Sequence, residues 1–169
     1  MDNNIRQQLT LFVDIKDSSE IESIRKKFNP RQWQLIAGHV TLCREDEIAN
    51  IDQVLGNLQN LDTSTITIHF GQVIRFDNNK GVLLPAFGDN EQFHMVRERI
   101  LAGSNISVRR HEPHITLMHP RNSNCTDENF EEIQQVNLPA TLNFDTVSHI
   151  RQIDGGPWQI IKSFNLKSD

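Results

Sequence analysis

A four-residue pattern occurs twice in this chain and limits how the chain can fold. The residues histidine, valine, threonine and leucine at 39–42 return 75 positions later as histidine, isoleucine, threonine and leucine at 114–117. This is the composition of a short, half-buried strand. Side chains alternate between the faces of a strand, so each histidine shares a face with its threonine. If the two strands lie side by side, they form a paired-histidine site.

The segments around the two patterns predict the same order of elements in each half of the chain. Each half reads strand, helix, pattern strand, helix, strand, strand. A turn cluster at 77–81 separates the halves. The expected elements cover residues 9–15, 18–28, 39–43, 46–59, 64–70 and 72–76, then 82–87, 91–101, 114–118, 126–136, 141–153 and 158–166. We therefore expect one domain over 1–169, built from internal repeats at approximately 1–77 and 81–169.

The first helix has recognisable end signals. Ser19 and Glu22 have the spacing of a capping box at its start, and Pro30 is expected to stop it.

Length and composition restrict the class of protein. A chain of 169 residues fits one compact domain, and no stretch approaches the roughly 20 apolar residues that span a bilayer. The first residues lack the basic-then-apolar layout of a secretory signal. Cys43 and Cys125 are too few and too far apart for a disulfide framework, which predicts two reduced thiols. We expect a cytoplasmic monomer without a membrane partner.

The charge balance restricts the partners. The net charge is −5 and the isoelectric point is about 5.8. A protein that holds a long nucleic-acid duplex usually carries a basic face. A small cyclic nucleotide or the end of an RNA needs only a few local cations, so these are the expected partners.

The two tetrapeptides, with the stretch 113–122, resemble the motifs of the two-histidine (2H) phosphoesterase superfamily, which includes RNA 2′,3′-cyclic phosphodiesterases, also called 2′-5′ RNA ligases. The resemblance implies an α+β fold of two lobes, with two antiparallel sheets lining a central cleft and helices outside. It implies that His39 and His114 are catalytic and that Thr41 and Thr116 bind phosphate. It implies no cofactor and no metal, and the chain has no His-x-His, Cys-x-x-Cys or His-Glu-x-x-His arrangement.

This residue set suits the hydrolysis of a cyclic phosphodiester. One imidazole takes a proton from water and the other protonates the departing ribose oxygen, because histidine titrates near neutral pH. The threonine hydroxyls would donate to the phosphate oxygens. We expect a metal-independent cyclic phosphodiesterase acting on 2′,3′-cyclic phosphates of RNA ends or small nucleotides.

Three other interpretations stay open on the sequence. The chain is a nucleotide-binding regulatory module, it joins RNA through 2′-5′ bonds by the reverse reaction, or its two histidines are unrelated residues at strand starts.

The remaining candidates have weaker patterns. Strand alternation would turn His119 to the face opposite His114, which predicts a structural role. His69 belongs to a solvated sheet face or to the cleft, and a surface position is expected for His94, His111 and His149. Candidate phosphate contacts are Arg44, Arg109, Arg110 and Arg121, and candidate stacking residues are Trp33, Phe76, Phe87 and Trp158.

Overall fold

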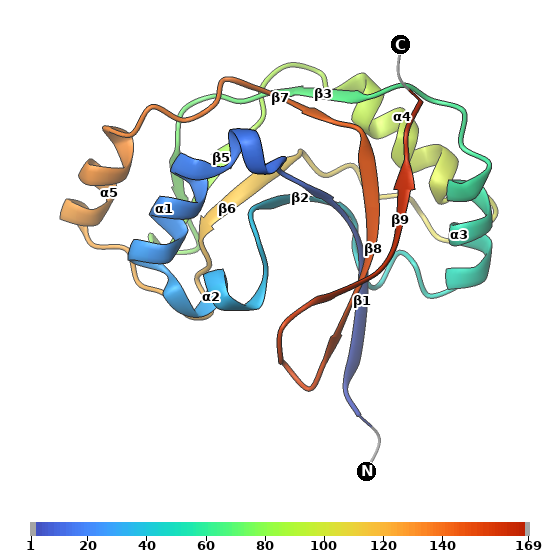
Figure 1. The fold of residues 1–169 in the computed structure, drawn as a ribbon, viewed down its shortest axis with the longest axis horizontal. Helices are drawn as coiled ribbons and strands as arrows, with labels where there is room; N and C mark the ends of the chain where they lie inside the picture. The colour runs from blue at the N-terminus through green and yellow to red at the C-terminus, as the bar shows by residue number, and fades with distance from the viewer. Residues whose placement is uncertain (1–2, 168–169) are drawn as a thin grey trace.

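The computed structural model describes residues 3–167 and has an α+β fold (Figure 1). Seven strands form one antiparallel sheet in the order β4-β5-β6-β2-β1-β8-β9, and β3 and β7 form a second, two-stranded sheet. The expected fold class is therefore confirmed. The larger sheet alone carries both motif strands, β2 and β6.

The strands are β1 (Ile5–Phe12), β2 (His39–Cys43), β3 (Ile66–His69), β4 (Ile74–Phe76), β5 (Gly81–Pro85), β6 (His114–Met118), β7 (Thr141–Phe144), β8 (Thr146–Ile153) and β9 (Gln159–Asn165). The helices are α1 (Ser19–Phe28), α2 (Pro30–Leu35), α3 (Ile51–Gln59), α4 (Glu91–Ile100) and α5 (Asp127–Gln134), with a 3₁₀ turn at Ile15–Asp17. Figure 1 shows α1, α2 and α5 in the left half of the view and α3 and α4 in the right half.

The two halves of the chain occupy equivalent places in the large sheet. Exchanging β1 with β5, β2 with β6 and β4 with β8 gives the same order of these six strands when the sheet is followed from its opposite edge. The pairing shifts at the same step in both halves, between Leu9 and Thr10 in β1 and between Val82 and Leu83 in β5. A duplicated chain would show this symmetry, and the internal repeats at 1–77 and 81–169 stay a prediction.

The halves are also interlocked. The last strand of the first half, β4, pairs with β5, and β8 of the second half pairs with β1. Helices cross in the same way, because α1 contacts β6 and α4 contacts β2. Each motif strand is therefore supported by a helix of the other half.

Burial follows the alternation predicted for the motif strands. Val40, Leu42 and Ile115 are fully buried and Leu117 is 1% exposed, while the histidines and threonines are only half-buried. Each buried aliphatic side chain contributes roughly 1.5–3 kcal/mol. Burial on one face leaves the other face of β2 and β6 available for polar side chains.

Several expected boundaries differ from the structure. The expected strand 141–153 is two strands, separated at Asp145, because β7 pairs in the small sheet and β8 in the large one. The helix expected from residue 46 begins at Ile51, because the Glu47 carboxylate accepts from the Arg44 amide at 2.8 Å and closes a turn there.

The capping box expected at the start of the first helix is not formed, whereas the helix ends where the sequence predicts. Ser18, not Ser19, is the N-cap of α1, and it makes no side-chain capping bond. The Glu22 carboxylate accepts from the Gly38 amide at 2.6 Å instead of capping the helix. Pro30 acts as expected, because α1 ends at Phe28 and Asn29, the residue before the proline, leaves the helical conformation. Pro30 also begins α2, since proline suits the first helical position.

Candidate active site

The pairing of β2 with β6 arranges the four motif side chains as a square. Val40 lies opposite Ile115 in this antiparallel pair. One residue away in each direction, His39 lies opposite Thr116 and Thr41 opposite His114. The two histidines therefore occupy diagonal corners, at a spacing of about 7–8 Å between strand positions.

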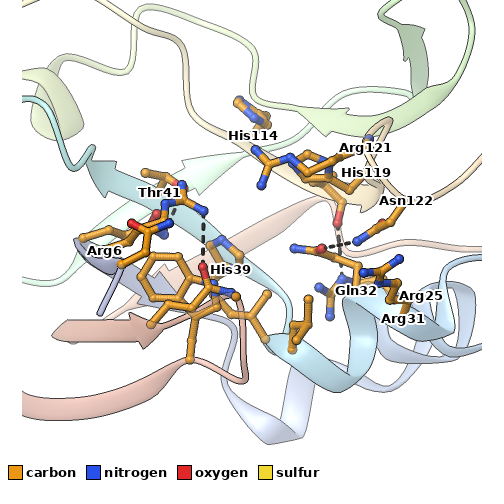
Figure 2. A pocket seen from close by; sticks show the side chains of 18 residues that line it. Arg6, Arg25, Arg31, Gln32, His39, Thr41, His114, His119, Arg121 and Asn122 are labelled. Atoms are coloured by element: carbon orange, nitrogen blue, oxygen red, sulfur yellow. Dashed lines mark hydrogen bonds between the residues drawn. The ribbon is translucent and has the colours of Figure 1, made fainter. Parts of the chain in front are cut away.

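All four side chains line one cavity of about 460 Å³ (Figure 2). A cavity of this size accepts a molecule as large as a nucleotide. The structure thus brings together all of the site residues that the motifs predict.

Backbone carbonyls orient both rings in the same way. His39 Nδ1 lies 2.7 Å from the carbonyl oxygen of Ala37, and His114 Nδ1 lies 3.2 Å from that of Glu112. A carbonyl oxygen only accepts, so we assign the Nδ1 proton to each ring. Nε2 of each neutral ring then keeps a lone pair and is the nitrogen that exchanges protons.

Burial makes both rings weak bases. It lowers the pKa of His39 from 6.5 to about 4, against the opposing effect of the Ala37 hydrogen bond. Burial also lowers the pKa of His114, with a smaller contribution from the positive charge of Arg44, and this shift is the smaller of the two. An anion bound between the rings would favour their charged forms and raise both pKa values.

The two threonines differ in their surroundings. Thr41 Oγ1 accepts from Gln8 Nε2 at 3.3 Å, and the same amide donates to Thr10 Oγ1 at 2.7 Å. Because its oxygen already accepts, Thr41 is left with its hydroxyl proton to donate to a ligand. Thr116 lines the cavity, and its backbone carbonyl accepts from Arg25 Nε at 3.3 Å.

Buried arginines support both motif strands. Arg25 is 2% exposed and Arg97 is 1% exposed, and each is the seventh residue of its helix, α1 or α4. Arg97 donates to the carbonyl of Leu42 in β2, as Arg25 donates to that of Thr116 in β6. Each arginine therefore holds the motif strand of the other half.

Acidic side chains balance these two buried charges. Arg97 pairs with Glu47 at 2.6 Å, and Arg25 pairs with Glu22 at 3.3 Å. The sequence analysis missed both arginines. What marks the two arginines is their shared position, the seventh residue of a helix. This shows only when α1 is aligned with α4, because neither arginine is close to a motif.

The cavity is strongly basic in composition, although the chain carries a net charge of −5. Among the lining residues that the structure describes, none is Asp or Glu, while four are arginines and three are histidines. Arginine suits the recognition of phosphate oxygens. The lining arginines are Arg6, Arg25, Arg31 and Arg121.

Of the four arginines proposed as phosphate contacts, Arg121 lines the cavity. Arg109 pairs with Asp46 and Arg110 with Glu112, and neither these two nor Arg44 is among the lining residues.

His119 corrects the expectation from strand alternation. β6 ends at Met118, so alternation does not extend to His119, and the loop after this strand places the ring against the cavity. His69 is exposed, bonds Thr141 Oγ1 through Nδ1 at 2.9 Å and is not a lining residue.

The surface positions expected for the other histidines are wrong. His94 is 7% exposed and His149 is 5% exposed. His111 is half-buried, and its Nε2 donates to the carbonyl of Thr41 at 3.2 Å. Single histidines leave no periodic signal, so their burial depends on tertiary contacts. Of the proposed stacking residues, Trp158 lines the cavity and the other three are not among its lining residues.

Residues 3–167 lack two features of other classes of protein. In this range, no group of three or more His, Cys, Asp or Glu side chains is placed to hold a metal ion. No helix in the same range is long and apolar enough to cross a membrane.

Solved structures with this fold include E. coli LigT, a protein of Thermus thermophilus and a protein described as a phosphoesterase. LigT of E. coli in complex with 3′-AMP has a TM-score of 0.66 at 13% identity, over 99% of this chain and 100% of that one. LigT with NADP+ has a TM-score of 0.68 at 14% identity, over 96% and 98%. TT0787 of Thermus thermophilus has a TM-score of 0.59 at 15% identity, over 97% and 99%. No curated protein sequence matches the chain significantly.

The sequence itself matches the family model of the 2′-5′ RNA ligase superfamily over residues 13–156. The chain therefore belongs to the 2′-5′ RNA ligase superfamily, which confirms the resemblance that its duplicated motifs indicated.

Proposed function

We propose that this protein is a metal-independent cyclic phosphodiesterase that opens 2′,3′-cyclic phosphates on RNA ends or small nucleotides. The diagonal arrangement of two imidazoles and two hydroxyls around one cavity is the observation that carries the proposal. Such a pair supplies a base and an acid on opposite sides of one phosphorus atom, as an in-line displacement requires.

The pKa values suggest which ring has which role. When one proton is shared between the rings, it resides on the ring with the higher pKa, which is His114. His39 is then the neutral base whose Nε2 accepts a proton from water. The water oxygen forms a bond to phosphorus while the bond to the ribose 2′ or 3′ oxygen breaks. His114 Nε2 gives its proton to that oxygen, and a phosphate monoester is the product.

The threonines stabilise negative charge on the phosphate oxygens, and the two buried arginines fix the geometry of the site. Hydroxyl protons of Thr41 and Thr116 would bond the non-bridging oxygens as negative charge accumulates there. Each such donor contributes about 2.7–4 kcal/mol at comparable oxyanion sites. Arg97 keeps β2 in position and Arg25 keeps β6 in position, so that the four side chains converge without reorganisation.

The test is turnover of adenosine 2′,3′-cyclic phosphate, followed by phosphorus NMR, with a chelator present throughout. The expected result is conversion of the cyclic ester to a monoester at the same rate as in a reaction without chelator. The spectrum identifies the 2′ or 3′ product. The matched control is the double variant His39→Asn, His114→Asn, which is expected to leave the cyclic ester intact.

Two outcomes would contradict the proposal. Binding of 3′-AMP in calorimetry without any turnover would favour a regulatory nucleotide-binding module. Accumulation of 2′-5′ linked product in excess of hydrolysis would favour ligation, the reverse reaction through the same transition state.

A further inference from the structure

A group of basic side chains lies at one end of the cavity, next to the motif residues. His119 and Arg121 come from the loop after β6, and Arg31 comes from α2 (Figure 2). We call these three residues the loop cluster. The proposed hydrolytic steps make no use of them.

Hydrogen bonds among polar side chains hold the loop that carries His119 and Arg121. Asn29, which is 1% exposed, accepts from the His119 amide at 2.8 Å and donates to Asn122 Oδ1 at 2.9 Å. Asn122 in turn donates to Gln32 Oε1 at 2.8 Å. These bonds tie the loop to the junction of α1 and α2, so the backbone that carries His119 and Arg121 needs little ordering when a ligand binds.

His119 has the opposite tautomer to the two motif histidines. Its Nδ1 accepts from the Arg121 amide at 3.1 Å, so the proton of the neutral ring is on Nε2. In either charge state, His119 therefore offers Nε2–H as a donor. This is suited to holding an anion rather than to accepting a proton from water.

Among the described residues, the two arginines of the cluster have no acidic partner. Within residues 3–167, neither Arg31 nor Arg121 has a carboxylate within 4 Å, whereas the other two cavity arginines, Arg6 and Arg25, each pair with a glutamate. A cyclic phosphodiester carries one negative charge. Two unpaired guanidinium groups beside it therefore match a ligand with a second anionic group.

We propose that the loop cluster binds a second phosphoryl group of the substrate, attached to the 5′ oxygen of the same nucleoside. The inference rests on the proposed function. Both the 5′-phosphodiester of an RNA end and a free 5′-phosphate have this chemistry.

The experiment compares kcat/KM for adenosine 2′,3′-cyclic phosphate with and without a 5′-phosphate. Charge-assisted hydrogen bonds to the added group predict a preference of about tenfold or more. Arg31→Gln and Arg121→Gln should each reduce this ratio several-fold. His119→Asn should do the same, since asparagine keeps an acceptor for the Arg121 amide but lacks Nε2–H. The control Arg99→Gln removes an exposed charge from α4 and should keep the wild-type ratio.

A dinucleotide ending in a 2′,3′-cyclic phosphate identifies the source of the group. A higher kcat/KM for the dinucleotide than for the 5′-phosphorylated nucleotide supports an RNA end, and the reverse supports a free 5′-phosphate.

The outcomes separate this inference from the proposed function. A wild-type ratio near one, with turnover of both substrates, would overturn the loop cluster alone. If neither substrate is turned over, the proposed function fails. Calorimetry with adenosine 3′,5′-bisphosphate and 3′-AMP then tests the cluster by itself. Tighter binding of the bisphosphate, lost in Arg121→Gln, supports it, and equal binding overturns it.

Discussion

The two halves of the site share their chemical parts but differ in the segment after each motif strand. His39 and His114 are oriented by equivalent carbonyls, and a buried arginine of the opposite half supports each strand. After β2, the chain closes a turn in which Glu47 pairs with Arg97. After β6, it forms the loop that carries His119 and Arg121.

This difference separates two tasks. The repeated parts form an acid–base pair, which requires two similar groups on opposite sides of one phosphorus. The parts that are not repeated lie at one end of the cavity and suit ligand binding, because a nucleotide is not symmetric. Substitutions in each half can test whether the motif residues and supporting arginines of the two halves are equivalent. They can also test whether the segments that differ contribute to ligand binding.

Loss of either imidazole should have the largest effect. His39→Asn and His114→Asn are each expected to lower kcat by about 10²–10⁴-fold, because each removes one partner of proton transfer. Steady-state hydrolysis of adenosine 2′,3′-cyclic phosphate measures this. His69→Asn, at an exposed histidine outside the lining, is the control. Near-wild-type activity in either motif variant would end the claim of a two-ring mechanism.

The threonines should rank next. Thr41→Val and Thr116→Val keep side-chain volume and remove the hydroxyl donor, for an expected loss of about 10²–10³ in kcat. Gln8→Leu removes the amide that donates to Thr41 Oγ1, so it should lower kcat through Thr41 alone. The loss in kcat should be smaller than that of Thr41→Val. Equal kcat values in wild type and both valine variants would show that the hydroxyls do not contact the transition state.

The supporting arginines should differ in their effect on stability. Arg97→Met leaves Glu47, which is 3% exposed, without its partner and is expected to lower the free energy of unfolding by about 3–5 kcal/mol. Arg25→Met should cost less, since the side chain of Glu22 is 25% exposed and stays hydrated.

Chemical denaturation followed by fluorescence measures both free energies. The double variant Arg97→Met, Glu47→Leu is the matched control and should recover part of the loss, because no unpaired buried charge remains. Equal losses for Arg25→Met and Arg97→Met would mean that the two supports are energetically alike.

The smallest predicted effect is a shift of the pH profile. In the free enzyme, His39 must be neutral and His114 protonated, and burial lowers both pKa values below 6.5. The kcat/KM profile should therefore be a bell with its maximum on the acid side of 6.5, falling as pH rises. Arg44→Gln should move the basic limb to higher pH, because the Arg44 charge lowers the pKa of His114. A maximum above about pH 7 would contradict these roles.

Features that depend on a regular spacing of apolar and polar residues were predictable from the sequence. The α+β class, the order of the elements and the exposure of the motif faces follow from alternation and helical spacing, which local residues determine. The square of side chains around the cavity also agrees with the prediction, because antiparallel pairing of two similar strands brings equivalent residues together.

Features that depend on long-range contacts were not predictable. Arg97 reaches the carbonyl of Leu42 across 55 positions, and Asn29 reaches the His119 amide across 90. The break at Asp145 reflects a change of sheet, and nothing in the local residues 141–153 marks which strand pairs where. Strand alternation failed at His119 because the strand ends one residue earlier.

The most direct test of the central claim is an NMR titration of the histidine rings with 3′-AMP. If both halves bind one phosphoryl group, the His39 and His114 signals should move together with a single Kd at one ligand per chain, and both pKa values should rise. Movement of one ring alone, or two separate Kd values, would show that the rings do not share a phosphorus and would contradict the account.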